Sequence, residues 1–313
     1  MISVEPALLA AAARLRHDVF VVGQGVDPEI EADGADRSAT HSVVQDGGRV
    51  VATGRLVEER SGRQTWARLG RIAVRPDLRG QRLGVQVVRE LEMAAAGLGL
   101  PRMRLHAQQG VVGFYERLGW HPVGAPDLEA GIVHRWMQRD LLPGIRPVRD
   151  SDAKAVQQLI GDCFREYPGC ALELDGLDEW MLAPSTGYDR RGGRLWVLPD
   201  AATGIAASCG LAPNGHNIEL KSLYVAASHR RRGYAGALVG VVERIARERG
   251  ASQVVLWSDT RFADAHRLYT RLGYARQSET RELHDSSNST EYRFSKPLPL
   301  TERDAPGPTH AFG

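Results

Sequence analysis

The sequence predicts an α/β protein of two tandem domains, each a mixed, mostly antiparallel twisted sheet flanked by helices. Three observations support this prediction. The chain has 313 residues, which is enough for two domains of ordinary size. The same order of strand, basic loop and helix patterns occurs twice along it. Each half also contains a hairpin-like pair of strands, and hairpins combined with alternating strands and helices are typical of a mixed sheet with helices on both faces.

The first half begins with a helix pattern. Leu8, Leu15 and Val19 are among the apolar residues that recur at helical spacing and predict a helix over residues 7–20. A turn at residues 46–48, Asp-Gly-Gly, joins two strands into a hairpin. The strands expected in this half are residues 42–44, 49–56, 66–74, 103–107 and 132–141, and the later helices are residues 85–98 and 112–118.

The boundary between the halves falls at residues 142–144, Leu-Pro-Gly, which separate two periodic segments. We therefore place an N-terminal domain at residues 1–142, a linker and first strand at 143–148, and a C-terminal domain at 145–298. The tail 299–313 is rich in Pro, Gly and charged residues and is expected to be disordered. The strands expected in the second domain are residues 145–148, 195–198, 204–211, 218–225, 253–258 and 292–295, and the helices are a segment that ends at Phe164 and residues 234–249 and 263–272.

Charge and composition exclude several classes of function. The formal net charge is +2, so neither nucleic acid nor a membrane surface is an expected partner. Three cysteines have no metal-ligand or disulfide spacing, and scattered histidines such as His106 and His121 are expected to be surface or packing residues. We see no signal peptide and no apolar run of the roughly 18 residues that span a bilayer, so a cytoplasmic monomer or homodimer is expected.

Two basic loops carry the strongest functional signal. The first lies within residues 71–84 and is followed by Phe-Tyr-Glu-Arg-Leu-Gly-Trp at residues 114–120. The second lies within residues 221–235 and is followed by Leu-Tyr-Thr-Arg-Leu-Gly-Tyr at residues 268–274. A strand that leads into exposed backbone N–H groups at a helix N-terminus can bind a pyrophosphate. Each loop is therefore a candidate phosphate site.

This order of parts resembles the GNAT superfamily of acetyl-CoA-dependent N-acetyltransferases, present here twice. The resemblance implies acetyl-CoA as co-substrate, no metal, and a phosphate loop that reads Arg or Gln, two variable residues, Gly, one variable residue, then Gly or Ala. The second half matches that pattern fully. The residues expected to bind the cofactor there are Leu223, Tyr224, Val225, Arg230, Arg231, Arg232, Gly233, Tyr234 and Ala235.

The first loop departs from the pattern because Arg82 stands where the first Gly is expected. Its Cβ could crowd the phosphate, or its side chain could fold outward and grip the phosphate itself, while Gly80 keeps a cradle feasible. Gln108 stands where family members carry an Asn that contacts the CoA arm, and Phe262 takes that place in the second half. The cofactor-binding residues expected in the first half are Ile72, Ala73, Val74, Arg79, Gly80, Gln81, Arg82, Leu83, Gly84 and Gln108.

The resemblance also implies a base and an acid. Glu219 lies on the strand before the second loop, where members with a glutamate base carry it, and its apolar neighbours are expected to raise its pKa. Tyr269 matches the tyrosine that protonates the departing thiolate, and Tyr115 matches it in the first half. Arg68 stands where Glu219 stands, so the first half has no carboxylate base on that strand. Without the resemblance, Glu219 would be an ordinary polar residue on an exposed strand face, and the two tyrosines would be half-buried aromatic residues that pack a helix on the sheet.

A segment near the N-terminus bears on the acceptor. Residues 16–21, Arg-His-Asp-Val-Phe-Val, resemble a GNAT branch related to acyl-homoserine-lactone synthases, in which an acidic loop lines the acceptor pocket. The acidic residues that follow here are Glu31, Asp33 and Asp36. A solvated charged loop is the alternative. A base in the first half would be His41, Glu31 or a chain of waters. In the second half, residues 166–169 and 281–292 are expected to lie near the pocket.

These features together predict an N-acetyltransferase that moves the acetyl group of acetyl-CoA to a primary amine by direct attack in a ternary complex, mainly in the C-terminal domain. The acceptor is expected to be a small-molecule amine or a peptide N-terminus. The alternative is a non-catalytic acetyl-CoA-binding sensor or scaffold module, which would keep the loops and lose the base and the acid.

Overall fold

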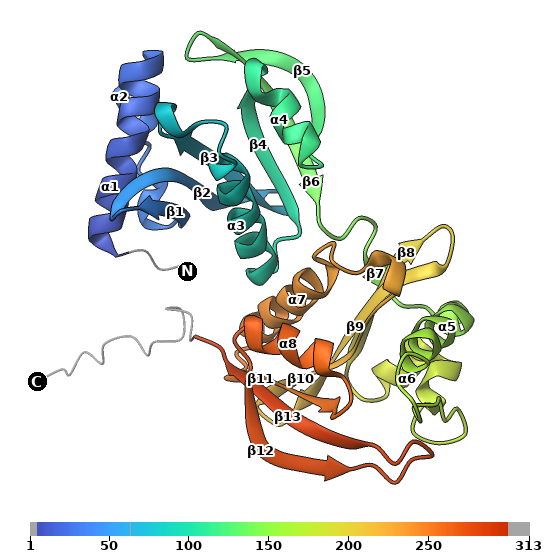
Figure 1. The fold of residues 1–313 in the computed structure, drawn as a ribbon. Helices are drawn as coiled ribbons and strands as arrows, with labels where there is room; N and C mark the ends of the chain where they lie inside the picture. The colour runs from blue at the N-terminus through green and yellow to red at the C-terminus, as the bar shows by residue number, and fades with distance from the viewer. Residues whose placement is uncertain (1–4, 63, 300–313) are drawn as a thin grey trace, which may run out of the picture. The chain divides into compact units, whose positions relative to one another are not determined.

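The computed structural model describes residues 5–62 and 64–299, so the predicted disordered tail lies outside the described residues beyond Pro299. The chain divides into two compact units between Leu141 and Leu142, each with its own sheet. In both units helices flank the sheet, and among the described strands one neighbouring pair is parallel while the other pairs are antiparallel (Figure 1). This arrangement confirms the predicted fold class.

The first unit opens with α1 (Pro6–Arg16), a π-helical turn (His17–Val22) and α2 (Pro28–Glu31). Its strands lie in the order β1-β2-β3-β4-β6-β5. Their bounds are β1 (Thr40–Asp46), β2 (Arg49–Ser61), β3 (Gln64–Val74), β4 (Arg102–Gln108), β5 (His121–Glu129) and β6 (Ile132–Asp140). The helix α3 (Leu83–Gly97) joins β3 to β4, and α4 (Val112–Arg117) joins β4 to β5.

The second unit repeats this plan with an additional edge strand at its start. Its strands lie in the order β12-β13-β11-β10-β9-β8-β7. Their bounds are β7 (Arg146–Pro147), β8 (Arg194–Asp200), β9 (Gly204–Asn214), β10 (Asn217–Val225), β11 (Gln253–Asp259), β12 (Ala275–Glu282) and β13 (Thr290–Pro297). The helices are α5 (Ala153–Phe164), α6 (Pro184–Asp189), α7 (Tyr234–Glu248) and α8 (Ala263–Arg271).

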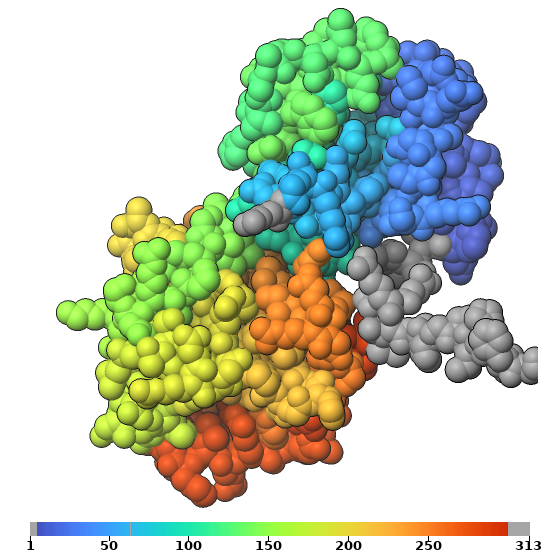
Figure 2. All heavy atoms as spheres, turned by 180° about the vertical axis from the view of Figure 1, so that it is seen from behind, coloured from blue at the N-terminus to red at the C-terminus, as the bar shows by residue number. Residues whose placement is uncertain are grey.

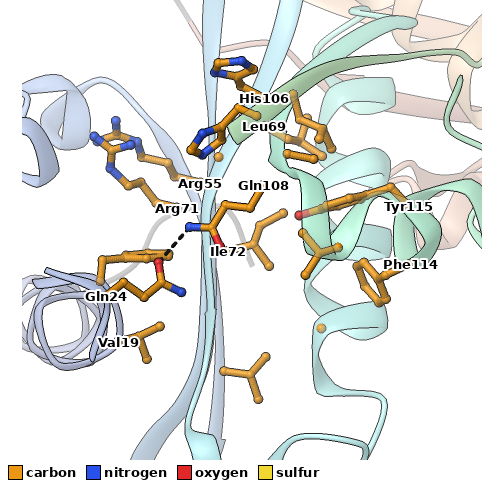
Figure 3. A pocket seen from close by; sticks show the side chains of 18 of the residues that line it. Val19, Gln24, Arg55, Leu69, Arg71, Ile72, His106, Gln108, Phe114 and Tyr115 are labelled. Carbon is orange, nitrogen blue, oxygen red and sulfur yellow. Dashed lines mark hydrogen bonds between the residues drawn. The ribbon is translucent and has the colours of Figure 1, made fainter. Parts of the chain in front are cut away.

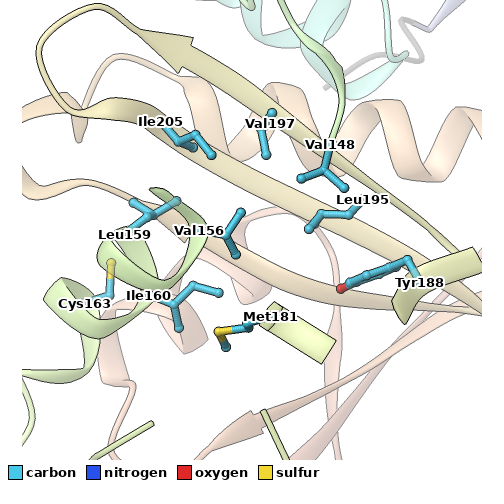
Figure 4. Packing of buried hydrophobic residues seen from close by; sticks show 10 residues of the cluster. All are labelled: Val148, Val156, Leu159, Ile160, Cys163, Met181, Tyr188, Leu195, Val197 and Ile205. Carbon is cyan, nitrogen blue, oxygen red and sulfur yellow. The ribbon is translucent and has the colours of Figure 1, made fainter. Parts of the chain in front are cut away.

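The core of the second unit shows why α5 forms where it does. Val156, Ile160 and Cys163 recur at helical spacing and face the sheet, where they pack with Leu195 and Val197 on β8 (Figure 4). Each such side chain contributes about 1.5–3 kcal/mol when it is fully buried. α7 covers the opposite side of the sheet (Figure 4). The C-terminal end of α5 is thereby held beside the end of β10.

Several elements differ from the sequence prediction. β5 and β12 are absent from it because both are largely exposed edge strands without a buried alternate face; Figure 2 shows the red β12–β13 segment at an outer edge of the second unit. The helices α2 and α6 are too short to give a periodic signal. The helix predicted over residues 7–20 ends as an α-helix at Arg16 and continues as the π-helical turn, a rare geometry that is frequent at functional sites.

Gly210 on β9 offers a test of the packing in the second unit. A Cβ at this position would lie 2.5 Å from the ring and hydroxyl of Tyr188. Overpacking of this kind typically costs about 1–3 kcal/mol, so Gly210→Ala should lower the urea midpoint of the protein. Gly236→Ala is the matched control, because the nearest atom to its Cβ is 4.0 Å away in Leu272. Equal midpoints for the two variants would contradict this packing.

Candidate functional site

In both units the two central parallel strands separate after a short contact. β3 pairs with β4 only from Ala67 to Leu69, although both strands continue well beyond. β10 pairs with β11 only at Ile218 and Glu219. A residue with a left-handed backbone follows each contact, Arg71 with φ 54° and Ser222 with φ 49°. The β2–β3 and β9–β10 registers shift at the same places, and such bulges bend a strand and increase its twist.

The loop after each separated strand has the same backbone shape in both units. Arg79 and Arg230 are extended, with ψ 153° and 163°. In each loop two residues with a left-handed backbone follow this arginine. The first of them is the glycine in the first unit, and the second is the glycine in the second unit. The four residues are Gly80 (φ 84°) and Arg82 (φ 61°) in the first unit, and Arg231 (φ 62°) and Gly233 (φ 86°) in the second. The replacement of the expected Gly by Arg82 therefore leaves the loop geometry intact.

Both loops present uncapped helix N-termini. Neither α3 nor α7 has a side chain that caps its first turn, so the first N–H groups are free of side-chain partners. A Cβ built on Gly80 or Gly233 would have no atom within 4 Å, so open space adjoins each loop. In the first unit the guanidinium groups of Arg79 and Arg82 are exposed and have no partner among the described residues. The first loop can therefore meet an anion with N–H groups and two cations.

A cavity of about 1260 Å³ lies beside the first loop. Its wall is built by the π-helical turn and α2, by β3, by the loop itself, and by the ends of β4 and β6. Among the residues predicted to bind the cofactor, those that line it are Ile72, Val74, Arg79, Gly80, Arg82, Leu83, Gly84 and Gln108. Ala73 is buried instead against Leu15 and Val19, and Gln81 lies outside the lining.

Gln108 and Tyr115 lie at the middle of this cavity (Figure 3). The Gln108 amide donates to the Oε1 atom of Gln24 at 2.8 Å, which links the end of β4 to the residues after the π-helical turn. The Tyr115 hydroxyl points toward Gln108 and Ile72 in Figure 3. Burial raises the pKa of Tyr115, so the phenol keeps its proton at neutral pH and can donate it.

An ion network closes one end of the cavity. Its members are Arg16, Glu31, Asp33, Asp36, Arg55 and Arg71. Burial acts to raise the pKa of Asp36, but hydrogen bonds from Arg16 and Arg55 outweigh it and hold this pKa well below its usual range. The Glu31 carboxylate lies 2.7 Å from Arg16, and His41, outside the lining, contacts the Asp36 carbonyl at 2.9 Å. The acidic loop is thus neutralised by arginines rather than solvated.

A histidine cluster lies on the cavity wall formed by β4, β5 and β6. The ring nitrogens of His106 contact Glu129 at 2.5 Å and Asp127 at 2.7 Å. The ring of His134 lies 4.8 Å from that of His106, and Trp136 stacks on His106 at 4.5 Å. His106, expected to be a surface or packing residue, therefore lines the cavity, and His134 carried no sequence signal because only the pairing of β6 with β4 brings it there.

In the second unit Glu219 and Tyr269 both have protein partners. The Glu219 carboxylate accepts a hydrogen bond from Lys221 at 2.7 Å. The sequence led us to expect apolar neighbours around this carboxylate, but a lysine ammonium group also lies beside it. Tyr269 is 5% exposed and packs edge-on against Tyr274 at 5.9 Å and beside Phe294 at 5.6 Å. Burial raises its pKa as it does for Tyr115. Both phenols therefore keep their protons at neutral pH.

The second loop differs from the first in that its leading arginine is occupied. Arg230 donates to both carboxylate oxygens of Glu166 at 2.6 Å and to the Val225 carbonyl at 3.1 Å. The Glu166 hydrogen bonds raise the pKa of Arg230. Just beyond residues 166–169, the Ala171 amide donates a hydrogen bond to Ser287 of the segment 281–292 at 3.0 Å. The chain after α5 is thus fastened to the leading arginine of the second loop and to the segment 281–292.

Aromatic rings extend this cover toward α8. Phe164 packs against Tyr224 on β10 at 5.9 Å and against Phe262 at 6.0 Å. Tyr167 contacts Phe262 at 4.6 Å. Phe262 is the residue that takes the place of the expected Asn, and here it serves as the platform for two rings. The end of the second separated strand is therefore covered by the chain that follows α5, whereas the first lines a cavity.

Among residues 5–62 and 64–299 there is no group of three or more His, Cys, Asp or Glu that could hold a metal ion. The helices within these ranges include none long and apolar enough to cross a bilayer.

The family-level comparison covers both domains. The acetyltransferase (GNAT) family matches residues 11–120 and 153–274. "Uncharacterized N-acetyltransferase YjcF" of Bacillus subtilis is 34% identical over 133 residues, which are 42% of this chain and 92% of that protein. Among solved structures, an acyl-CoA N-acyltransferase from Pseudomonas aeruginosa is 31% identical over 44% of this chain and 93% of its own, with a TM-score of 0.40. Escherichia coli ElaA is 28% identical over 45% of this chain and 100% of its own, with a TM-score of 0.39.

The chain belongs to the GNAT family, and two copies of the family domain make up most of its length. It is an acyltransferase of the N-acetyltransferase type, and members of this family use an acyl-CoA as co-substrate and an amine as acceptor.

Glu166→Gln should loosen the cover of the second loop. An ion pair of this exposure contributes up to about 1 kcal/mol, so freeing Arg230 should tighten acetyl-CoA binding at the second loop by about two- to fivefold. Calorimetry on the full chain would measure this, with Arg79 and Arg82 both changed to Ala to weaken the first loop. Asp162→Asn on the same helix, which removes an exposed pairing with Arg165, is the control. Weaker acetyl-CoA binding after Glu166→Gln would show that the pairing of Glu166 with Arg230 does not hinder binding at the second loop.

Proposed function

We propose that the first domain transfers the acetyl group of acetyl-CoA to a primary amine, by direct attack in a ternary complex. The observation that carries this proposal is the cavity that joins the first loop to Tyr115. The sequence favoured the second domain because its loop matches the family pattern fully. The contacts favour the first, because in the second domain Glu166 occupies the leading arginine of the loop and aromatic rings pack on the end of its strand.

The residues present fit an acyl-CoA. Arg79 and Arg82 are placed to bind phosphates beside the free N–H groups of α3, and the separated edge of residues 72–74 can pair with an amide-containing arm. Small-molecule pockets measure about 300–1,000 Å³. The cavity of about 1260 Å³ is larger than one such ligand needs, which suits two substrates bound together.

Acyl-CoA, when bound, supplies a thioester whose carbonyl carbon an amine can attack. Tyr115 is the proposed acid, because its buried phenol keeps a proton and has no hydrogen-bond partner among the described residues. Gln108 and Gln24 are positioned to hold the CoA arm once their mutual hydrogen bond opens. Holding amine and thioester together in one cavity lowers the entropic barrier to their reaction.

The second domain keeps its own proposed pair, with Glu219 as base and Tyr269 as acid. Glu219 would have to give up its contact with Lys221 to accept a proton. The loop would also need Arg230 to leave Glu166 before it could meet a phosphate. Turnover in this domain therefore depends on opening of the segment after α5.

The double substitution Arg79→Ala with Arg82→Ala tests the cofactor site. Loss of two charge-assisted contacts should weaken acetyl-CoA binding at least about tenfold. The matched control is Arg14→Ala with Arg60→Ala, which removes the same charge from exposed positions outside the cavity. Similar dissociation constants for the two double variants, measured by calorimetry, would rule out the first loop as the phosphate site.

Tyr115→Phe and Tyr269→Phe together identify the domain that turns over. Removal of a general acid typically lowers the rate by about 100-fold or more. We expect Tyr115→Phe to lower kcat for CoA thiol release to that extent with little change in KM, and Tyr269→Phe to leave it near the wild-type value. The assay is acetyl-CoA with a panel of simple primary amines. The reverse order of effects would assign catalysis to the second domain.

A further inference from the structure

The proposed function leaves one role in the first domain unfilled, removal of a proton from the acceptor ammonium. Arg68 occupies the strand position at which the second domain has Glu219, and the carboxylates on the cavity wall already have partners. These pairs are Glu31 with Arg16, Asp33 with Arg55, Glu58 with Arg60, Glu59 with Arg104, and Glu129 with His106. A base must have a free lone pair that faces the substrate.

The two cavity histidines differ in this respect. Both ring nitrogens of His106 meet carboxylates, and an imidazolium would satisfy both, so His106 offers no free lone pair. Among the described residues His134 has one hydrogen-bonding partner, the Ile132 carbonyl, which lies 2.9 Å from its Nδ1 atom. A carbonyl can only accept, so Nδ1 carries the proton, and the neutral ring holds its lone pair on Nε2. Nε2 has no partner among the described residues.

Strand pairing fixes where His134 lies. His134 is directly opposite Gln108 across the β4–β6 pair, and both residues line the cavity. On its other side His134 is opposite Asp127 on β5. The charged and titratable groups around it are His106 on β4, Asp127 and Glu129 on β5, Arg135 on β6 and Arg68 on β3. Of these two carboxylates Glu129 lines the cavity, and it places a negative charge within the reach of an ammonium ion bound beside His134.

We infer that His134 is the general base of the first domain and that the acceptor ammonium binds between it and Glu129 of β5. This rests on the proposed function. The acceptor nitrogen loses two protons in the reaction. Nε2 of His134 takes the first and passes it to solvent. As the C–N bond forms and the C–S bond breaks, the second proton leaves the nitrogen and replaces the one that Tyr115 gives to the departing sulfur.

The test is His134→Gln in the full chain, assayed by thiol release from acetyl-CoA with benzylamine, cadaverine and alanine amide as probe acceptors. We expect a loss of about 100-fold in kcat/KM, unchanged acetyl-CoA affinity by calorimetry, and loss of the acidic limb of the pH profile. Added imidazole should restore part of the activity of His134→Ala, which a merely structural role would not allow. His121→Gln, at an exposed position of β5 outside the cavity, should behave as wild type.

Nitrogen NMR of histidine-labelled protein tests the same assignment without an acceptor. We expect His134 to show a protonated Nδ1 and an unprotonated Nε2, with a shift in the Nε2 signal when acetyl-CoA binds. The opposite tautomer overturns the inference. Full activity in His134→Gln while Tyr115→Phe is impaired overturns the inference but leaves the proposed function standing. No thiol release by the wild-type protein with any probe amine overturns both.

Discussion

The site in each domain depends on one backbone constraint, the early separation of its two parallel strands. β3 and β4 pair only from Ala67 to Leu69. Arg71 then takes a left-handed backbone conformation that residues other than glycine rarely adopt. In the second domain Ser222 does the same, and its hydroxyl accepts a hydrogen bond from Tyr188 at 2.7 Å. Because the strands part, the N-terminus of the next helix, the strand edge and the following tyrosine all border one space. Without the bulge, this space would be filled by a continuous ladder.

The two domains use this constraint differently because of the segment that lies beside the loop. In the first domain the π-helical turn and α2 put Phe20, Gln24 and Ile30 on the cavity wall, and the nearby acidic residues are held by arginines. In the second domain the chain after α5 puts Glu166 on Arg230 and aromatic rings over the strand end. The loop backbones are alike, so the difference between an open and a covered site comes from the N-terminal helices of each domain.

The repeat, the loops and the tyrosines could be predicted from the sequence because each is a local pattern. The crowding considered for Arg82 could not be judged from the pattern alone, since the left-handed backbone that accepts a side chain there is a property of the folded loop. Glu166 was expected near the pocket, but its contact with Arg230, 64 residues away, was not predictable from spacing. His134 escaped detection for the same reason, because strand pairing rather than a motif brings it opposite Gln108. Long-range contacts therefore decided in which of two similar loops the leading arginine is already paired.

Hydrogen–deuterium exchange of the full chain with and without acetyl-CoA tests the central claim most directly, because it reports on both loops in one experiment. We expect slower amide exchange on addition of acetyl-CoA in residues 78–86 and 108–115, with a smaller change in residues 230–237. Protection of residues 230–237 with no change in residues 78–86 would contradict this claim and place the acyl-CoA site in the second domain.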